Sequence, residues 1–112
     1  MISKVKQDYM FPLGMLFTRK SVIKTLNFFI INRDRDYSIS EVQSATKMTR
    51  QTLDYSIPVL LKFKVLQSTR VVGNTQMYAY NHKAVICLDI NNLVGHLFDK
   101  LNTIENTEQK EV

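Results

Sequence analysis

Apolar residues along the first half of the chain return at the spacing of α-helices. From Lys20 this period predicts a first helix, which ends at a polar, charged loop over residues 32–36. Ser38 and Glu41 have the spacing of a capping box, so we expect a short second helix to begin there. The apolar face of the first helix is predicted to consist of Val22, Ile23, Leu26, Phe29 and Ile30.

A third helix is expected over residues 50–63, with Thr49 as its N-cap. Pro58 lies inside this helix, and because proline removes one backbone hydrogen bond we expect a kink there and no break. The inward face is predicted to contain Leu53, Ile57, Leu60 and Leu61. The outward arc then holds Gln51, Thr52, Tyr55, Val59 and Lys62.

Two runs of β-branched and aromatic residues after the third helix predict a β-hairpin. They cover residues 65–72 and 75–80 and flank the dipeptide Gly73-Asn74. Glycine accepts the positive φ that a tight hairpin turn requires. We interpret Tyr37 as entering a very short strand, which would give the hairpin sheet two or three strands.

The last quarter of the chain is predicted to contain a C-terminal helix. Residues 84–88 fit either a helix or a strand, but from Asn91 a helix is expected to about Asn102, with a frayed polar tail over residues 105–112. Its apolar stripe is longer than a small core can cover, so we expect a homodimer interface, or alternatively a stripe that folds back over the first helix. The predicted interface residues are Ile90, Leu93, Val94, Leu97, Phe98 and Leu101.

The order helix, short helix, turn, helix and hairpin is typical of a winged helix-turn-helix, in which the hairpin is the wing. The expected fold class is α+β, mainly α, with a two- or three-stranded β-wing and a C-terminal dimerisation helix. We expect a single domain over residues 1–112. Its predicted parts are an N-terminal arm (1–17), the winged helix-turn-helix (18–81), a C-terminal helical segment (82–104) and the frayed tail (105–112).

Positive charge is concentrated in the part predicted to form the winged helix-turn-helix. The chain has 15 Lys and Arg against 10 Asp and Glu, which gives a net charge of +5. Twelve bases and five acids fall within residues 1–82, whereas residues 83–112 carry three bases and five acids. This asymmetry favours a polyanion as the partner of the first part.

Several other classes of protein are disfavoured by the sequence. No apolar run is long enough to span a membrane and no signal-peptide pattern is present, so we expect a cytoplasmic protein. Cys87 is the only cysteine, which leaves a buried apolar role, a redox sensor or a bridge across a dimer. His82 and His96 do not share a helical face with it, which argues against a metal site. Because no phosphate-binding loop, nucleophile elbow or catalytic carboxylate pair is present, we expect neither a cofactor nor enzyme activity.

Residues around the third helix carry the predicted DNA contacts. Arg50 and Gln51 can form bidentate hydrogen bonds with guanine and adenine edges, respectively. Thr52 can meet a thymine methyl or a phosphate, and Tyr55 can donate a hydrogen bond to a phosphate oxygen. The helix N-terminus at Thr49 adds a partial positive charge suited to a phosphate. The complete predicted set is Lys47, Thr49, Arg50, Gln51, Thr52, Tyr55, Lys62, Arg70 and Asn74.

Four short motifs carry a resemblance to a known group of proteins. They are Leu16-Phe17, Ser38-x-x-Glu41-Val42, Thr49-Arg50-Gln51-Thr52-Leu53 and Val72-Gly73-Asn74-Thr75-x-x-Tyr78-x-x-Asn81. With these motifs, residues 16–81 resemble the winged-helix transcriptional regulators of archaea and bacteria, the broad group that includes MarR-type and ArsR-type proteins. The resemblance implies a dimeric repressor or activator whose third helix enters the major groove. The chain departs from the pattern at Gln43, which replaces an alanine, at Thr46, which replaces an apolar residue, and at Lys47, which replaces a glycine.

The residue type at Lys47 has a conformational consequence. Either this lysine takes the left-handed backbone conformation that glycine adopts more easily, or the turn has another shape.

Two functions are consistent with these observations. The first is sequence-specific binding of double-stranded DNA by a homodimeric transcriptional regulator, for which the presence of a small-molecule effector is left open. The alternative is a winged-helix module that binds proteins and not DNA. Two features reduce the DNA affinity that we expect: the wing carries Arg70 as its only base, and Asp54 places a carboxylate near the reading face.

Overall fold

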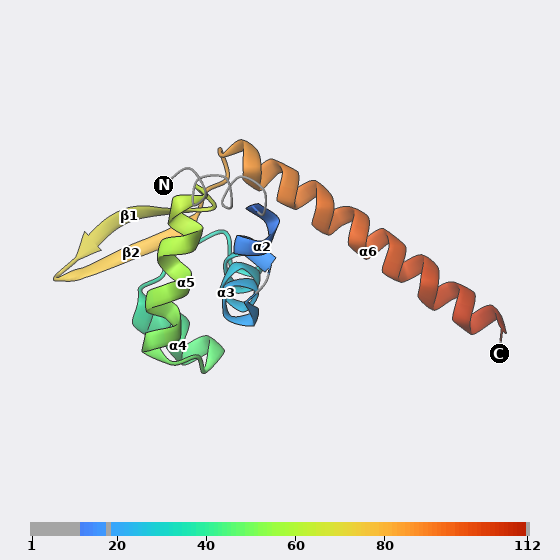
Figure 1. Cartoon of the computed structure of the whole chain (residues 1–112), viewed down its shortest axis with the longest axis horizontal. Helices are drawn as coiled ribbons and strands as arrows, with labels where there is room; N and C mark the ends of the chain where they lie inside the picture. Colours follow the sequence, from blue (N-terminus) through green and yellow to red (C-terminus); the bar gives the residue numbers. More distant parts are fainter. Residues whose placement is uncertain (1–11, 18, 112) are drawn as a thin grey trace, which may run out of the picture. The chain divides into compact units, whose positions relative to one another are not determined.

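Within its described residues, the first of two compact units, residues 1–81, consists of four helices and a hairpin (Figure 1). The structure, a computed structural model, describes residues 12–17 and 19–111, and their side chains apart from those of Pro12, Met15 and residues 105–111. The first eleven residues of the predicted N-terminal arm therefore lie outside the described part. The remainder of that arm forms a short helix, α2 (Pro12–Phe17).

Helix α3 (Lys20–Ile31) confirms the predicted first helix, but its buried face differs from the prediction. Val22, Leu26 and Phe29 are buried as predicted, whereas Ile23 is exposed. Thr25, which was not predicted to face the core, is buried. At about 100° per residue, Ile23 lies beyond the edge of the arc centred on Val22, and Thr25 lies within it. Burial of Thr25 is compatible with its polarity because its hydroxyl donates to the carbonyl of Ser21 at 2.7 Å.

Helix α4 (Ile39–Thr46) begins at the predicted capping box. The Ser38 hydroxyl accepts a hydrogen bond from the Glu41 N–H at 3.1 Å, and the Ser38 N–H donates to the Glu41 carboxylate at 2.9 Å. Two of the N–H groups that lack a partner within the helix are thereby satisfied, which fixes the point at which the helix begins. The buried Val42 is the main core residue of this short helix.

Helix α5 (Arg50–Lys62) packs against both α3 and the hairpin (Figure 1). Leu53, Ile57 and Leu60 are buried as predicted, but Leu61 is only half-buried. The helix continues through Pro58 without a break. Thr52 and Val59, both placed on the outward arc by the sequence, are half-buried because they lie at its edge.

The hairpin consists of β1 (Leu66–Val72) and β2 (Thr75–Tyr80), joined at Gly73 with φ +64°. Both predicted runs and the predicted turn are confirmed. Tyr37 and Tyr78 exchange two backbone hydrogen bonds of 2.7 and 2.8 Å, so a third strand is reduced to a single bridge. Only Leu66 of β1 is buried, and the far half of the hairpin therefore projects from the core as a wing.

The second unit, residues 82–112, contains one long helix, α6 (Val85–Glu111). The ambiguous segment 84–88 is thus helical from Val85 onward. The predicted end near Asn102 is wrong, since helical backbone extends to Glu111. The fraying of residues 105–112 stays a prediction. The sequence of this extension contains Glu, Gln and Lys, which have high helix propensity.

Candidate nucleic-acid interface

In the turn between α4 and α5, Lys47 has a left-handed backbone conformation, the first of the two alternatives that the sequence left open. Lys47 is the C-cap of α4 with φ 63° and ψ 17°, and its N–H donates to the carbonyl of Gln43 at 2.9 Å. Its side chain is exposed. A short connection of this kind brings the start of α5 directly after α4, as a helix-turn-helix requires.

Thr49 caps α5, as predicted. Its hydroxyl oxygen accepts a hydrogen bond from the Thr52 N–H at 3.2 Å and lies 2.7 Å from the Thr52 hydroxyl oxygen. Thr52 is therefore engaged in the first turn of its own helix. This pairing fixes the exposed first turn in which Arg50 and Gln51 lie.

Arg50 and Asp54 form an ion pair on the exposed side of α5. The Nε atom of Arg50 lies 3.2 Å from Oδ1 of Asp54, and both side chains are largely exposed. The two terminal nitrogens of Arg50 take no part in this contact. The carboxylate offsets the charge of the arginine while it restricts its orientation.

Tyr55 lies on the same outward face as Gln51 and is 41% exposed. One face of its ring is covered by Arg19, whose guanidinium carbon lies 4.1 Å from the ring centroid. Lys62 is also exposed, but it lies in the last turn of α5, roughly 16 Å along the helix axis from Gln51. The residues gathered near the start of α5 are thus Arg50, Gln51 and Tyr55, together with Arg19.

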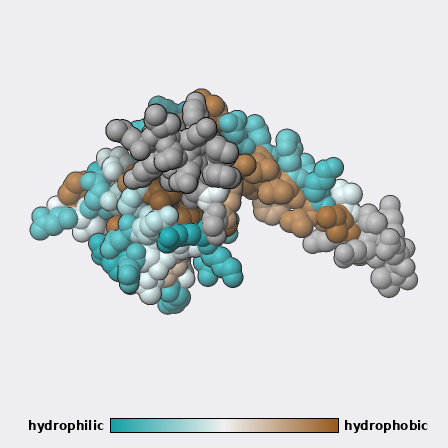
Figure 2. Space-filling model, in the orientation of Figure 1, coloured by the Kyte–Doolittle hydropathy of each residue, from teal (hydrophilic) through white to brown (hydrophobic). Residues whose placement is uncertain are grey.

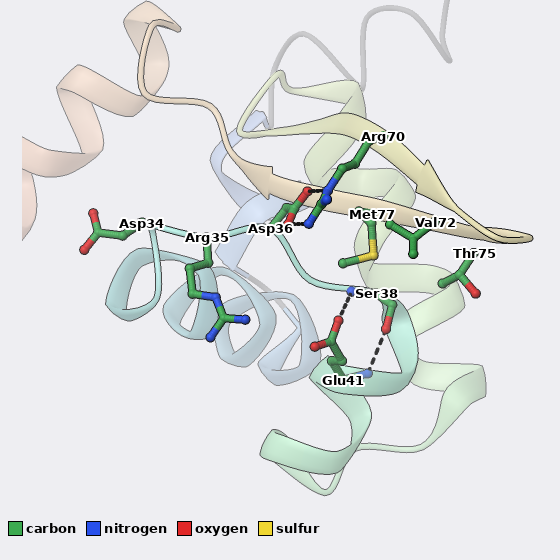
Figure 3. Close-up of a pocket in the computed structure, with 9 residues that line it drawn as sticks. All are labelled: Asp34, Arg35, Asp36, Ser38, Glu41, Arg70, Val72, Thr75 and Met77. Carbon is green, nitrogen blue, oxygen red and sulfur yellow. Dashed lines mark hydrogen bonds and ion pairs between the residues drawn. The ribbon is translucent and has the colours of Figure 1, made fainter.

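Arg70 does not point freely from the wing. Its Nε and Nη2 atoms donate to the two carboxylate oxygens of Asp36 at 2.9 and 3.2 Å (Figure 3). The Thr69 hydroxyl donates to the same carboxylate at 2.7 Å. The Asp36 side chain is 17% exposed, compared with 65% for Arg70. The hydrogen bonds from Arg70 and Thr69 lower the pKa of Asp36 to about 2, and this carboxylate raises the pKa of Arg70 above its usual value.

A β-bulge explains why two consecutive residues reach one carboxylate. Ser68 pairs with Tyr78 and Val71 pairs with Gln76, so Thr69 and Arg70 together face a single residue of β2. In a regular strand their side chains would point to opposite faces of the sheet. The Gln76 side chain stabilises the bulge by donating to the carbonyl of Arg70 at 3.0 Å.

The tip of the wing is apolar apart from its turn. Val71 and Val72 are exposed, and Asn74 lies beside them in the turn with its side chain exposed. The structure thus separates the predicted contact residues into four places. At or near the start of α5 lie Lys47, Thr49, Arg50, Gln51, Thr52 and Tyr55. Lys62 lies in the last turn of α5, Arg70 is held at Asp36, and Asn74 is at the wing tip.

The predicted dimer residues lie on α6 and differ in exposure. Ile90 is buried and Val94 is half-buried, whereas Leu93, Leu97, Phe98 and Leu101 are exposed. Apolar side chains follow one face along this helix in the space-filling view (Figure 2). Cys87, near the start of the helix, is buried.

Three residues of this surface were missed by the sequence analysis: Arg19, Asp36 and Thr69. Asp36 was assigned to an exposed charged loop, and its partner is 34 residues away in the sequence. Arg19 lies 36 residues before the ring that it covers. No local pattern identifies such pairs, because they depend on how the elements pack.

The described residues contain neither a candidate metal centre nor a helix suited to span a membrane. No group of three or more His, Cys, Asp or Glu side chains there is placed to hold a metal ion. No helix within the described ranges combines the length and the apolar character needed to cross a bilayer.

Comparisons with known proteins identify the fold. No protein-family model and no curated protein matches the sequence. Among solved structures, Rv0081 of M. tuberculosis has a TM-score of 0.61 with 18% identity, over 93% of this chain and 95% of that one. Reduced HlyU from Vibrio cholerae N16961 has a TM-score of 0.59 with 13% identity, over 87% and 95%.

A third likeness covers less of both chains. The ferric uptake regulator from Francisella tularensis, solved with iron, has a TM-score of 0.54 with 17% identity, over 59% of this chain. The chain spans about half of that protein, 54% of its length. Together with the helix order and the antiparallel hairpin, these likenesses show that the chain has the α+β, mainly helical, winged-helix fold.

Proposed function

We propose that this chain is a cytoplasmic transcriptional regulator, without enzyme activity, that binds specific double-stranded DNA sequences as a homodimer. The observation that carries the proposal is the exposed side of the first half of α5, a helix that begins shortly after the left-handed turn at Lys47. An α-helix fits the major groove, which is about 12 Å wide. With α5 in that groove, Arg50 and Gln51 face base edges while Tyr55 lies nearer a phosphate.

The fold likenesses support this proposal. One of the similar structures is by name a regulator, the ferric uptake regulator. Two others match nearly the whole chain, and so include part of the C-terminal helix as well as the winged helix. Closer membership in the MarR-like or ArsR-like group belongs to the proposal and rests on the sequence motifs.

The α6 surface supports the homodimer. This helix of 27 residues is about 40 Å long and exposes Leu93, Leu97, Phe98 and Leu101. Apolar residues with alternating spacings of four and three form the seam of a two-stranded coiled coil. In α6 this seam consists of Ile90, Val94, Leu97, Leu101 and Ile104. Ile90 is already buried in the single chain, so the part open to a partner extends from Val94 to Ile104. A second copy presents the same seam and is therefore the partner that we propose.

The alternative, a winged-helix module that binds protein, is favoured by two observations. Arg50 and Arg70 are each paired with a carboxylate, and the wing tip exposes Val71 and Val72. Compensated charge reduces the counterion release on which DNA affinity depends, and exposed apolar residues suit a protein partner.

Selection of bound fragments from a random duplex pool tests the proposed function. We expect an enriched, palindromic site with half-sites about one helical turn apart. Gln51→Ala should weaken binding to that site by about 10-fold or more and relax the base preference at one position of each half-site. The same variant should bind mixed-sequence DNA as the unmodified chain does.

Lys24→Ala is the matched control, because Lys24 is exposed on α3 and is outside the proposed set of contacts. Failure to enrich any sequence, from a chain that is folded by circular dichroism, would contradict specific DNA recognition. Absence of duplex binding at low salt would leave the protein-binding module as the better function.

A further inference from the structure

We propose that Arg19 is a DNA-backbone contact of the α5 surface, held in position by the ring of Tyr55. This inference rests on the proposed function and adds a residue to it that comes from outside the helix-turn-helix. Its basis is the 4.1 Å distance between the guanidinium carbon of Arg19 and the centroid of the Tyr55 ring. A planar guanidinium on an aromatic face is a favourable cation–π arrangement.

The backbone at Arg19 is fixed by the start of α3. Arg19 is the N-cap residue, in an extended conformation, and its carbonyl accepts hydrogen bonds from Val22 at 3.2 Å and Ile23 at 3.3 Å. Its side chain makes no capping hydrogen bond. The side chain instead extends to α5, against which α3 packs, and ends over Tyr55.

Arg19 also differs from Arg50 and Arg70, the two arginines predicted from the sequence, in that its charge is not paired with a described carboxylate. The Nε of Arg50 donates a hydrogen bond to Asp54, and the Nε and one terminal nitrogen of Arg70 donate to Asp36. Among the described side chains, no carboxylate lies within ion-pair distance of Arg19. It therefore brings to the edge of the proposed interface a positive charge that no described carboxylate compensates.

The position at the edge indicates phosphate and not base contact. A helix with its side chains is 10–12 Å wide and fills a major groove of about 12 Å. Side chains at the centre of its outward face then meet base edges, whereas groups beside that face meet the flanking phosphates. Arg19 lies beside the outward face, next to Tyr55, and its planar fork matches two phosphate oxygens.

The role of Tyr55 is thereby extended. Its ring restricts the Arg19 side chain before DNA arrives, which reduces the rotamer entropy lost on binding. The ring is needed for this role, and the hydroxyl is not. Phenylalanine at position 55 should therefore still hold the Arg19 side chain in place, whereas alanine should not.

The test measures affinity for a mixed-sequence duplex of about three helical turns, between about 50 and 200 mM salt. Loss of one phosphate contact lowers the slope of log affinity against log salt by about one per subunit. We expect this decrease for Arg19→Ala, with affinity reduced about 5-fold or more at the middle of the range. Arg19→Lys keeps the charge and should keep the slope.

Variants of Tyr55 test the coupling. Tyr55→Phe should keep the slope of the unmodified chain, whereas Tyr55→Ala should lower it toward that of Arg19→Ala. The double variant Arg19→Ala/Tyr55→Ala should have the same slope as Arg19→Ala alone. Lys24→Ala, which removes an exposed charge elsewhere on α3, controls for net charge and should change the slope much less than Arg19→Ala does.

The outcomes separate this inference from the function on which it rests. An unmodified chain that binds no duplex overturns both. A chain that binds, and whose affinity and slope survive Arg19→Ala, overturns only the contact at Arg19. Equal effects of Arg19→Ala and Lys24→Ala would also overturn it, since a general charge effect would then explain the loss.

Discussion

Two lysines, Lys47 and Lys64, hold left-handed backbone conformations, with φ of 63° and 65°. Lys64 follows the C-cap of α5, where the Val65 N–H donates to the Leu60 carbonyl and the Lys64 N–H donates to the Leu61 carbonyl, both at 3.0 Å. This is the Schellman arrangement, in which the left-handed position is usually glycine. The hydrogen bonds that end α5 thus require a conformation that is strained for lysine.

Replacement of Lys64 by glycine should therefore stabilise the protein. Relief of about 1–2 kcal/mol of left-handed strain is partly offset by the greater freedom of glycine in the unfolded chain. We expect the free energy of unfolding in urea to rise by about 0.5–1 kcal/mol. Lys62→Gly, within the helix, is the matched control and should lower it by up to about 1 kcal/mol. A loss of stability in both variants would contradict the strain at Lys64.

The strain at Lys47 could be considered from the sequence, but the strain at Lys64 could not. Lys47 occupies a position of the helix-turn-helix that favours glycine, so the presence of a lysine there already indicated a strained, left-handed backbone. Lys64 belongs to a helix end whose position was predicted only to within a residue, and the conformation of a single residue depends on that position.

At the scale of elements, local patterns predicted the capping box at Ser38, the N-cap at Thr49 and the turn at Gly73. Each of these features is determined by residues close together in the sequence. The pairing of Asp36 with Arg70 was not predicted, because it requires the bulge in β1 and the approach of a distant loop. Contacts of the candidate site that join separate elements therefore escaped prediction, while most of the elements themselves did not.

The Asp36 contact should make the stability of the wing depend on pH. The pKa of Asp36 is lowered from 3.8 to about 2 in the folded chain, so folding favours the ionised carboxylate. Its stabilising effect is fully present above about pH 4, the unfolded value, and is lost as pH falls toward 2. We expect Asp36→Asn to be less stable than the unmodified chain at pH 7.

Urea unfolding at a series of pH values checks this expectation. The difference in unfolding free energy between the unmodified chain and Asp36→Asn should stay constant from pH 7 to about 5 and decrease below about pH 4. Asp34→Asn, in the same loop and with the same change of charge, is the control. A difference for Asp36→Asn that does not change with pH would show that the carboxylate charge is not what holds Arg70.

At the scale of the whole molecule, the proposed function depends on how two copies meet through α6. The apolar seam of this helix was predicted from spacing, but its length was underestimated because the polar residues after Asn102 continue the helix. The structure adds Ile104, an exposed apolar residue one helical turn beyond Leu101, to the predicted stripe. A longer seam offers more area for a second copy to cover.

Leu97 lies near the middle of this seam and is 53% exposed in the single chain. Aspartate at this position would place two like charges against each other in a two-stranded coiled coil, where their burial is strongly unfavourable. Leu97→Asp should therefore sediment as a monomer while the unmodified chain sediments as a dimer. Asn92→Asp adds the same charge on the opposite, exposed side of α6 and should leave the dimer intact.

The same pair of variants connects assembly with DNA recognition. Two winged helices joined through α6 bind a palindromic site with one association event, so separating them should weaken binding to that site by about 100-fold or more. Binding to a single half-site should change little, because the α5 surface of each copy is unaltered. If Leu97→Asp remained a dimer, the seam would not be the interface. If it became a monomer with unchanged affinity for the palindrome, recognition would not depend on the pairing of two copies.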